Sequence, residues 1–156
     1  MLLHKSYYKL LGIIIFIILA SKGFAETLSQ NGFNFSNFWI KEVVANNKST
    51  SGYFTIENTN NEDERLIFIS SNFSEKTELH NMFVENDIMK MKHLSEDVII
   101  KAKSKLILKP GGYHLMFIKL NEDLQLKKKY DVHLRFKSGK TIVLSMSVKN
   151  KASNSK

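Results

Sequence analysis

Residues 130–148 read YDVHLRFKSGKTIVLSMSV, two runs of alternating apolar and polar residues joined by a short turn. In the first run Val132, Leu134 and Phe136 alternate with polar residues, and the second run alternates in the same way after Ser138-Gly139. Successive side chains of a strand point to opposite faces of a sheet. This stretch therefore predicts a β-hairpin with one face turned towards a hydrophobic core.

The same period of two recurs in short runs from Asn37 onward, and no stretch keeps the 3.6-residue period of a helix for long. Polar or glycine-containing turns separate the runs, and Pro110-Gly111-Gly112 is the strongest of them. We expect a single all-β domain, a Greek-key β-sandwich, with closure into a barrel as the alternative. The predicted strands cover residues 38–44, 52–57, 66–71, 77–84, 88–94, 105–108, 113–120, 130–137 and 141–148.

The composition excludes several classes of protein. The 156 residues are 43% hydrophobic and 24% charged, which fits one globular domain and neither a disordered chain nor a multispanning membrane protein. The chain has no cysteine, so a disulfide scaffold, a thiol nucleophile, a zinc-thiolate site and a cysteine-linked lipid anchor are excluded for these residues. The formal net charge is +8, but the lysines are scattered, so we expect a solvated surface and no nucleic-acid partner.

The first 25 residues have the features of an export signal. Lys5 and Lys9 precede an apolar run that is too short to span a bilayer, and Gly23-Phe24-Ala25 provides small residues for cleavage after Ala25. We therefore expect an exported protein. Its expected parts are a signal peptide (1–25), a lead-in (26–36), the β-sandwich domain (37–148) and a disordered polar tail (149–156).

Histidine and methionine recur at a spacing of two. The pairs are His80-x-Met82 and His114-x-Met116, and Met89-x-Met91 repeats the spacing with two thioethers. Residues i and i+2 of a strand share a face, so each pair can present both side chains to one ion. The alternative is that these methionines fill gaps in the core. Two His-x-Met pairs in an exported chain without cysteine favour a metal site.

The softness of the donors indicates the metal. Thioethers are poor ligands for Zn(II), Ca(II) and Mg(II), whereas Cu(I) accepts methionine and histidine together. We therefore expect Cu(I). His93 lies two residues after Met91, and it is an auxiliary candidate that could hold Cu(II).

From Asn37 to Val148 the chain resembles the periplasmic copper chaperones of the PCu(A)C family. The resemblance rests on the stretches GYFTIEN (52–58), ELHNM (78–82), MKM (89–91) and LKPGGYHLM (108–116). The family pattern is a His, ten residues, a Met, a gap in the low twenties and then His-x-Met. This chain follows the pattern with a gap of 22 residues, one longer than the family's usual gap. The resemblance implies a cupredoxin-like fold and the Cu(I) ligands His80, Met91, His114 and Met116, with Met82 and Met89 as auxiliary or alternate ligands.

The resemblance also implies a role, which is to carry copper to the copper centres of cytochrome oxidase. The expected partner is a copper-accepting protein, either an oxidase subunit or another copper chaperone, and the membrane is reached only through that partner. We expect no catalytic activity, because a blue-copper site needs a cysteine and no hydrolase motif is present. The alternative is a metal-free, exported β-sandwich that acts as an interaction module.

Overall fold

The computed structural model describes residues 26–94 and 97–150, and all regular elements there are β-strands, which confirms the expected all-β fold. Over these residues no helix has the length and apolar character needed to cross a membrane. The expected signal peptide and residues 151–156 of the expected tail lie outside the described residues. The strands are β1 (Thr27–Gln30), β2 (Phe33–Lys41), β3 (Ser49–Asn58), β4 (Glu64–Ser71), β5 (Ser74–Glu85), β6 (Ile88–His93), β7 (Val98–Ile100), β8 (Lys105–Leu108), β9 (Tyr113–Leu120), β10 (Lys129–Phe136) and β11 (Thr141–Lys149).

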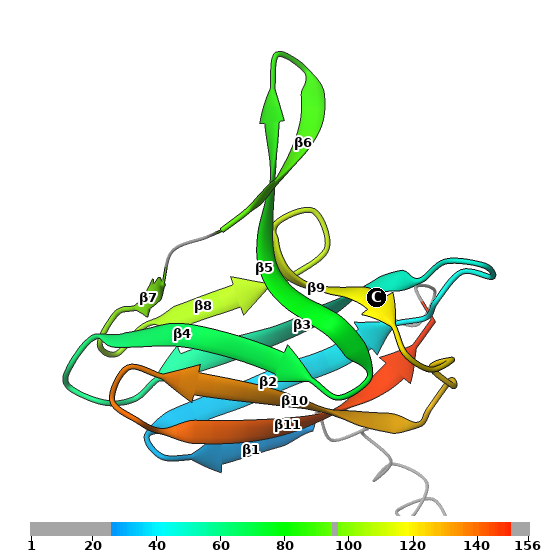
Figure 1. The fold of residues 1–156 in the computed structure, drawn as a ribbon. Helices are drawn as coiled ribbons and strands as arrows, with labels where there is room; N and C mark the ends of the chain where they lie inside the picture. Colours follow the sequence, from blue (N-terminus) through cyan, green and yellow to red (C-terminus); the bar gives the residue numbers. More distant parts are fainter. Residues whose placement is uncertain (1–25, 95–96, 151–156) are drawn as a thin grey trace, which may run out of the picture.

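The strands follow one continuous hydrogen-bonded path in the order β6-β5-β9-β3-β2-β11-β10-β4-β7, with β1 added to β2 and β8 added to β3. Neighbouring strands are antiparallel except β11 and β2, which run parallel. The path curls, so that strands from its two halves cover the same core (Figure 1). The two layers of the expected sandwich are therefore parts of one continuous hydrogen-bonded sheet.

The predicted hairpin at residues 130–148 is present as β10 and β11. Val132 pairs with Leu144, and Leu134 pairs with Ile142. All four side chains are buried in the main hydrophobic cluster. The alternation of the sequence therefore corresponds to the two faces of the hairpin.

The domain begins before residue 37, which corrects the expected lead-in at residues 26–36. Phe33 and Phe35 lie in β2 and are fully buried. The ring of Phe33 stacks on Phe136 of β10, with 4.4 Å between ring centroids and an interplanar angle of 16°. Since β11 lies between β2 and β10 in the sheet order, this contact crosses the interior of the curled sheet.

Two short strands were not predicted from the sequence. β1 has the polar sequence TLSQ, and β7 is only three residues long. Each is held by pairing with a longer strand, β1 with β2 and β7 with β4. Such strands depend on the neighbouring strand more than on their own pattern.

β5 and β6 form a hairpin that projects from the body of the domain (Figure 1). We call residues 80–93 the arm. Its two-residue turn is Asn86-Asp87, with φ values of 53° and 60°, as the turns favoured in hairpins require. The lower part of β5 pairs with β9 instead, so the foot of the arm lies where β6, β5 and β9 run side by side.

Candidate metal centre

His80 occupies the middle of a row of three imidazoles at the foot of the arm. It lies on β5, directly opposite His93 of β6 on one side and His114 of β9 on the other. The ring centroid of His80 is 5.5 Å from that of His93 and 5.7 Å from that of His114. Cross-strand partners share a face of the sheet, so the three rings lie on one face.

The methionines lie on the same face, on both sides of this row along the strands. On the side towards the tip of the arm, Met82 lies opposite Met91, and Met89 follows one same-face step further. On the other side, Met116 of β9 lies opposite Glu78 of β5. The register and the two-residue alternation therefore bring every histidine and methionine expected from the sequence to one face of β6, β5 and β9.

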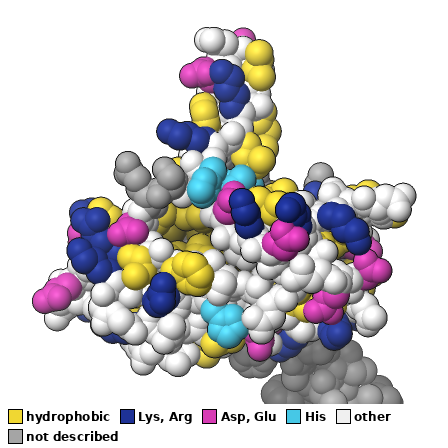
Figure 2. All heavy atoms as spheres, in the orientation of Figure 1, with side chains coloured by type: hydrophobic (Ala, Val, Ile, Leu, Met, Phe, Trp, Pro, Cys, Tyr) yellow, Lys and Arg dark blue, Asp and Glu magenta, His cyan; other side chains and the backbone are white. Residues whose placement is uncertain are grey.

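Burial divides these residues into two groups. His80 and His114 are only 7% and 3% exposed, while Met91 and Met89 are 53% and 60% exposed. Figure 2 shows histidine side chains gathered at the foot of the arm and hydrophobic side chains along it. The face thus combines two buried imidazoles with thioethers that solvent or a partner can reach.

One nitrogen of His80 has a partner and the other has none. Nε2 lies 2.9 Å from Oε2 of Glu78. Nδ1 is buried and is the one buried side-chain nitrogen or oxygen within residues 26–94 and 97–150 that has no hydrogen-bond partner. Leaving a buried polar atom unpaired costs about 1–3 kcal/mol, so such an atom in a native fold indicates a ligand or another role.

The contact with His80 favours the ionised form of the Glu78 carboxyl. The hydrogen bond from His80 lowers the pKa of Glu78 below its usual value. Partial burial opposes this shift, whereas the nearby His93 and His80 rings also lower the pKa. Glu78 is therefore an ionised acceptor at neutral pH. An ionised carboxylate has no proton to donate.

His114 is held through its other nitrogen. Its Nδ1 lies 2.9 Å from the carbonyl oxygen of Gly112, in the turn that precedes β9. The same carbonyl accepts the backbone N–H of Met82 at 3.2 Å. The Pro110-Gly111-Gly112 turn thus fixes the ring of His114 and ties it to the arm.

Met116 has a polar neighbour on the adjacent strand. The hydroxyl of Ser51 on β3 lies 3.9 Å from Sδ of Met116, its cross-strand partner, and donates a weak hydrogen bond to it. This contact orients the thioether, which is partly buried.

The donor set suits a soft ion. Among the described residues no group of three or more His, Cys, Asp or Glu side chains is arranged to hold a metal. A site built on His80 and His114 therefore needs thioethers to complete it. Imidazole and thioether together fit Cu(I), and the buried free nitrogen of His80 is consistent with such a group.

Glu78 and Ser51 are not among the site residues expected from the sequence. Glu78 could have been found, because its two-residue spacing from His80 places it on the same face of the strand. Ser51 could not, because its place beside Met116 depends on the register of β3 against β9.

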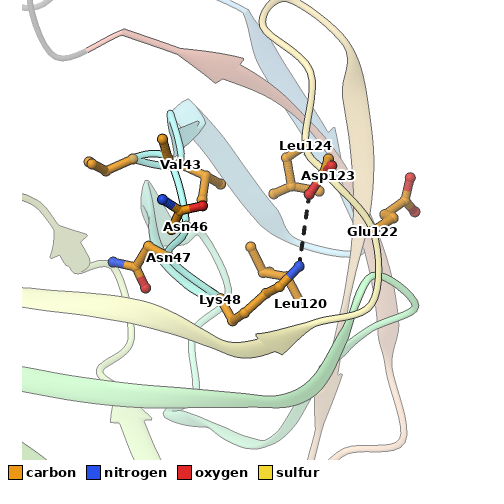
Figure 3. Close-up of a pocket in the computed structure, with 10 residues that line it drawn as sticks. Val43, Asn46, Asn47, Lys48, Leu120, Glu122, Asp123 and Leu124 are labelled. Atoms are coloured by element: carbon orange, nitrogen blue, oxygen red, sulfur yellow. Dashed lines mark ion pairs between the residues drawn. The ribbon is translucent and has the colours of Figure 1, made fainter.

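A pocket of the described residues lies away from this face. It encloses about 490 Å³ between the loops after β2 and after β9, and an ion pair of 4.0 Å between Lys48 and Asp123 crosses it (Figure 3). Leu120, which lines it, is six residues after His114 along β9, or about 20 Å. No histidine or methionine lines this pocket, so it adds no soft donor to the candidate centre.

Comparison of the sequence with known proteins gives a family and two relatives. Residues 33–148 match the family model described as "Putative lipoprotein LpqE-like". The "Putative lipoprotein Lxx21020" of Leifsonia xyli is 28% identical over 120 residues, which are 77% of this chain and 71% of the relative. An uncharacterized protein of Rickettsia prowazekii is 26% identical over 98 residues, which are 63% of this chain and 54% of the relative.

Solved structures of PCuAC domains share the fold. A copper-bound PCuAC domain from PmoF2 superposes with a TM-score of 0.68 at 13% identity, covering 80% of this chain and 98% of the domain. The Cu(I) form of DR1885 from Deinococcus radiodurans gives a TM-score of 0.58 at 21% identity, covering 85% of this chain and 87% of the other. The resemblance expected from the sequence is thus confirmed at the level of the fold.

Proposed function

The chain belongs to the LpqE-like family, and from this membership, its PCuAC-type fold and its His/Met face we propose that it is an exported, non-catalytic copper chaperone. Its cargo is Cu(I). The observation that carries the proposal is the buried imidazole pair of His80 and His114, with Met82, Met91 and Met116 on the same face. The copper-bound PCuAC domain and the Cu(I) form of DR1885 have this fold, which supports the choice of copper.

The proposed ligands are His80, Met91, His114 and Met116. Met82, Met89 and His93 are auxiliary ligands, and His93 is the auxiliary candidate for Cu(II). His80 and His114 supply a fixed, buried part of the site. Met91 is more than half exposed, so it is the ligand that a partner can displace first.

Transfer then proceeds by ligand exchange. The thioethers and neutral imidazoles add no negative charge to the ion, so a partner with thiolates or more imidazoles binds Cu(I) more tightly and removes it. The proposed recipient is a copper centre of cytochrome oxidase or another copper chaperone.

We propose that the signal peptide is cleaved after Ala25 and that the protein resides in the periplasm. The names of the family and of the Leifsonia relative describe lipoproteins, which supports export. These 156 residues contain no cysteine, so they offer no site for a cysteine-linked lipid.

An anaerobic competition titration with a chromogenic Cu(I) chelator tests the proposal. Wild-type protein should bind one equivalent tightly, and the double variant His114→Ala/Met116→Ala should lose it. The control is His133→Ala, which removes a histidine from β10, outside the His/Met face. If the wild type fails to compete, or if the double variant binds equally well, the proposal is wrong.

A metal-free interaction module is the second candidate, and the arm favours it. Large apolar side chains are exposed there, and exposed apolar surface is typical of a contact site for another protein. The same titration separates the two functions, because a module of this kind needs no copper. The exposed apolar residues of the arm are Phe83, Val84, Ile88, Met89 and Met91.

A further inference from the structure

We propose that Glu78 is a positioning residue that fixes the tautomer of His80, so that copper binds Nδ1 of His80 but Nε2 of His114. This inference rests on the proposed function and goes beyond it, because it assigns the binding nitrogen of each imidazole and gives a role to a residue that is not a ligand.

The assignment for His80 follows from its hydrogen bond. Oε2 of Glu78 lies 2.9 Å from Nε2 of His80, and an ionised carboxylate can only accept. Nε2 therefore carries the proton of the neutral ring, and the lone pair is on Nδ1. Nδ1 is the buried atom that has no partner among the described residues, so the lone pair is free for a metal.

The assignment for His114 is the opposite. A backbone carbonyl has no proton, so the 2.9 Å contact with the oxygen of Gly112 requires Nδ1 of His114 to be the donor. The lone pair of the neutral ring is then on Nε2. Two facing histidines are thus held in different tautomers by two different acceptors.

Glu78 acts through His80 and is not itself a ligand in this proposal. Only its Oε2 is shown to accept from His80, but a carboxylate is a hard donor that suits Cu(I) poorly. The side chain of Glu78 is 25% exposed and that of His80 is 9% exposed, so the contact is partly shielded from water. A carboxylate that accepts the second N–H of a metal-binding imidazole orients the ring and makes its other nitrogen more basic.

Nitrogen-15 NMR of the histidine rings in the full chain tests the tautomers directly. Without copper, His80 of the wild type should be protonated at Nε2, and His114 at Nδ1. On anaerobic addition of Cu(I), the Nδ1 resonance of His80 should shift while its Nε2 keeps its proton. A wild-type His80 protonated at Nδ1, or a His80 that loses the Nε2 proton when copper binds, would overturn the proposal.

Two variants and one control test the role of Glu78. Glu78→Ala should weaken Cu(I) binding about 10–100-fold, the usual effect of removing such a partner. Glu78→Gln should recover most of the affinity, because its amide oxygen can still accept from Nε2. The control Glu75→Gln removes another carboxylate from β5, one that pairs with Lys119, and should leave affinity and tautomers unchanged.

The outcomes separate this inference from the proposed function. Unchanged affinity and an unchanged His80 tautomer in both Glu78 variants would overturn the inference while the copper site stands. A wild type that does not bind Cu(I) would overturn the proposed function and the copper assignment together. The tautomer of His80 in the copper-free protein would then still report on the Glu78 contact alone. If Glu78→Ala does not fold, the nitrogen-15 assignment of the His80 ring in the wild type carries the test, because a ring protonated at Nδ1 overturns the inference without any variant.

Discussion

Met82 on β5 lies directly opposite Met91 on β6, one same-face step beyond the pair formed by His80 and His93. Met89 lies a further step away, opposite Val84. The distance of each thioether from the imidazole row therefore increases from Met91 to Met89. This order distinguishes the contributions of Met89 and Met91, which their two-residue spacing alone leaves equivalent.

We predict that Met91→Leu weakens Cu(I) binding about 10-fold or more and that Met89→Leu has a much smaller effect. Leucine keeps the apolar bulk but removes the sulfur, so the change tests ligation and not packing. Chelator competition under anaerobic conditions measures both affinities. Met146→Leu is the control, because Met146 is fully buried in β11 and away from the face. Equal losses for Met89 and Met91 would contradict the order.

A second prediction concerns the strand beside the site. A Cβ atom added at Gly52 of β3 would lie 2.7 Å from Cε2 of Phe117, whose ring is fully buried in β9. The ring packs against that of Phe73, with 4.8 Å between ring centroids, so Gly52→Ala should lower the free energy of unfolding by about 1–3 kcal/mol. Urea unfolding measures the change.

Gly112→Ala provides the comparison for that experiment. The nearest atom to an added Cβ there is Cγ of Lys109 at 3.7 Å, an ordinary contact with a flexible side chain. The stability of this variant should stay close to that of the wild type. Similar losses in both variants would show that the close approach of Gly52 and Phe117 is not the cause.

The sequence predicted those parts of the fold whose pattern is local. The hairpin at Val132 and Ile142 was predictable because alternation and a glycine turn occur together. β1 and β7 were not, because they depend on pairing with β2 and β4. Phe33 was assigned to a lead-in because its burial depends on Phe136, about a hundred residues further along the chain.

In the candidate centre, too, the arrangement within one strand was predictable and the arrangement between strands was not. The two-residue spacing placed His80 with Met82, and His114 with Met116, on common faces of their own strands. It could not show that His93 lies opposite His80, because that register depends on the length of the arm and on its turn. It also could not show which nitrogen each ring presents, because this depends on Glu78 and on the carbonyl of Gly112.

A third prediction tests whether the domain begins at β2. Phe33→Ala should destabilise the protein by about 3–5 kcal/mol, the usual cost of removing a buried aromatic ring. The loss includes the stacking contact with Phe136. Phe68→Ala should cost far less, because Phe68 is 49% exposed and its ring lies against the guanidinium of Arg135 on the surface. Comparable unfolding midpoints for wild type and Phe33→Ala would show that the segment before residue 37 is dispensable.

A fourth prediction concerns acid stability. Burial alone would raise the pKa of Glu64, but hydrogen bonds from Ser138 and from the backbone N–H of Arg65, together with the charge of Lys140, outweigh it and lower the pKa. A carboxyl whose pKa is lower in the folded state stabilises the fold above its unfolded pKa of about 4.5. This contribution is lost as the pH falls through the folded pKa.

Glu64→Gln should therefore be less stable than the wild type at pH 7. The difference should begin to shrink below about pH 4.5, where the carboxyl of the unfolded chain takes up a proton, and should be lost below the lower pKa of the folded state. Urea unfolding at a series of pH values from neutral to acid measures both stabilities. Glu62→Gln is the control, since Glu62 is an exposed carboxylate two residues away. A constant difference between wild type and Glu64→Gln at every pH would mean that the contacts of Glu64 stabilise the fold without depending on its charge.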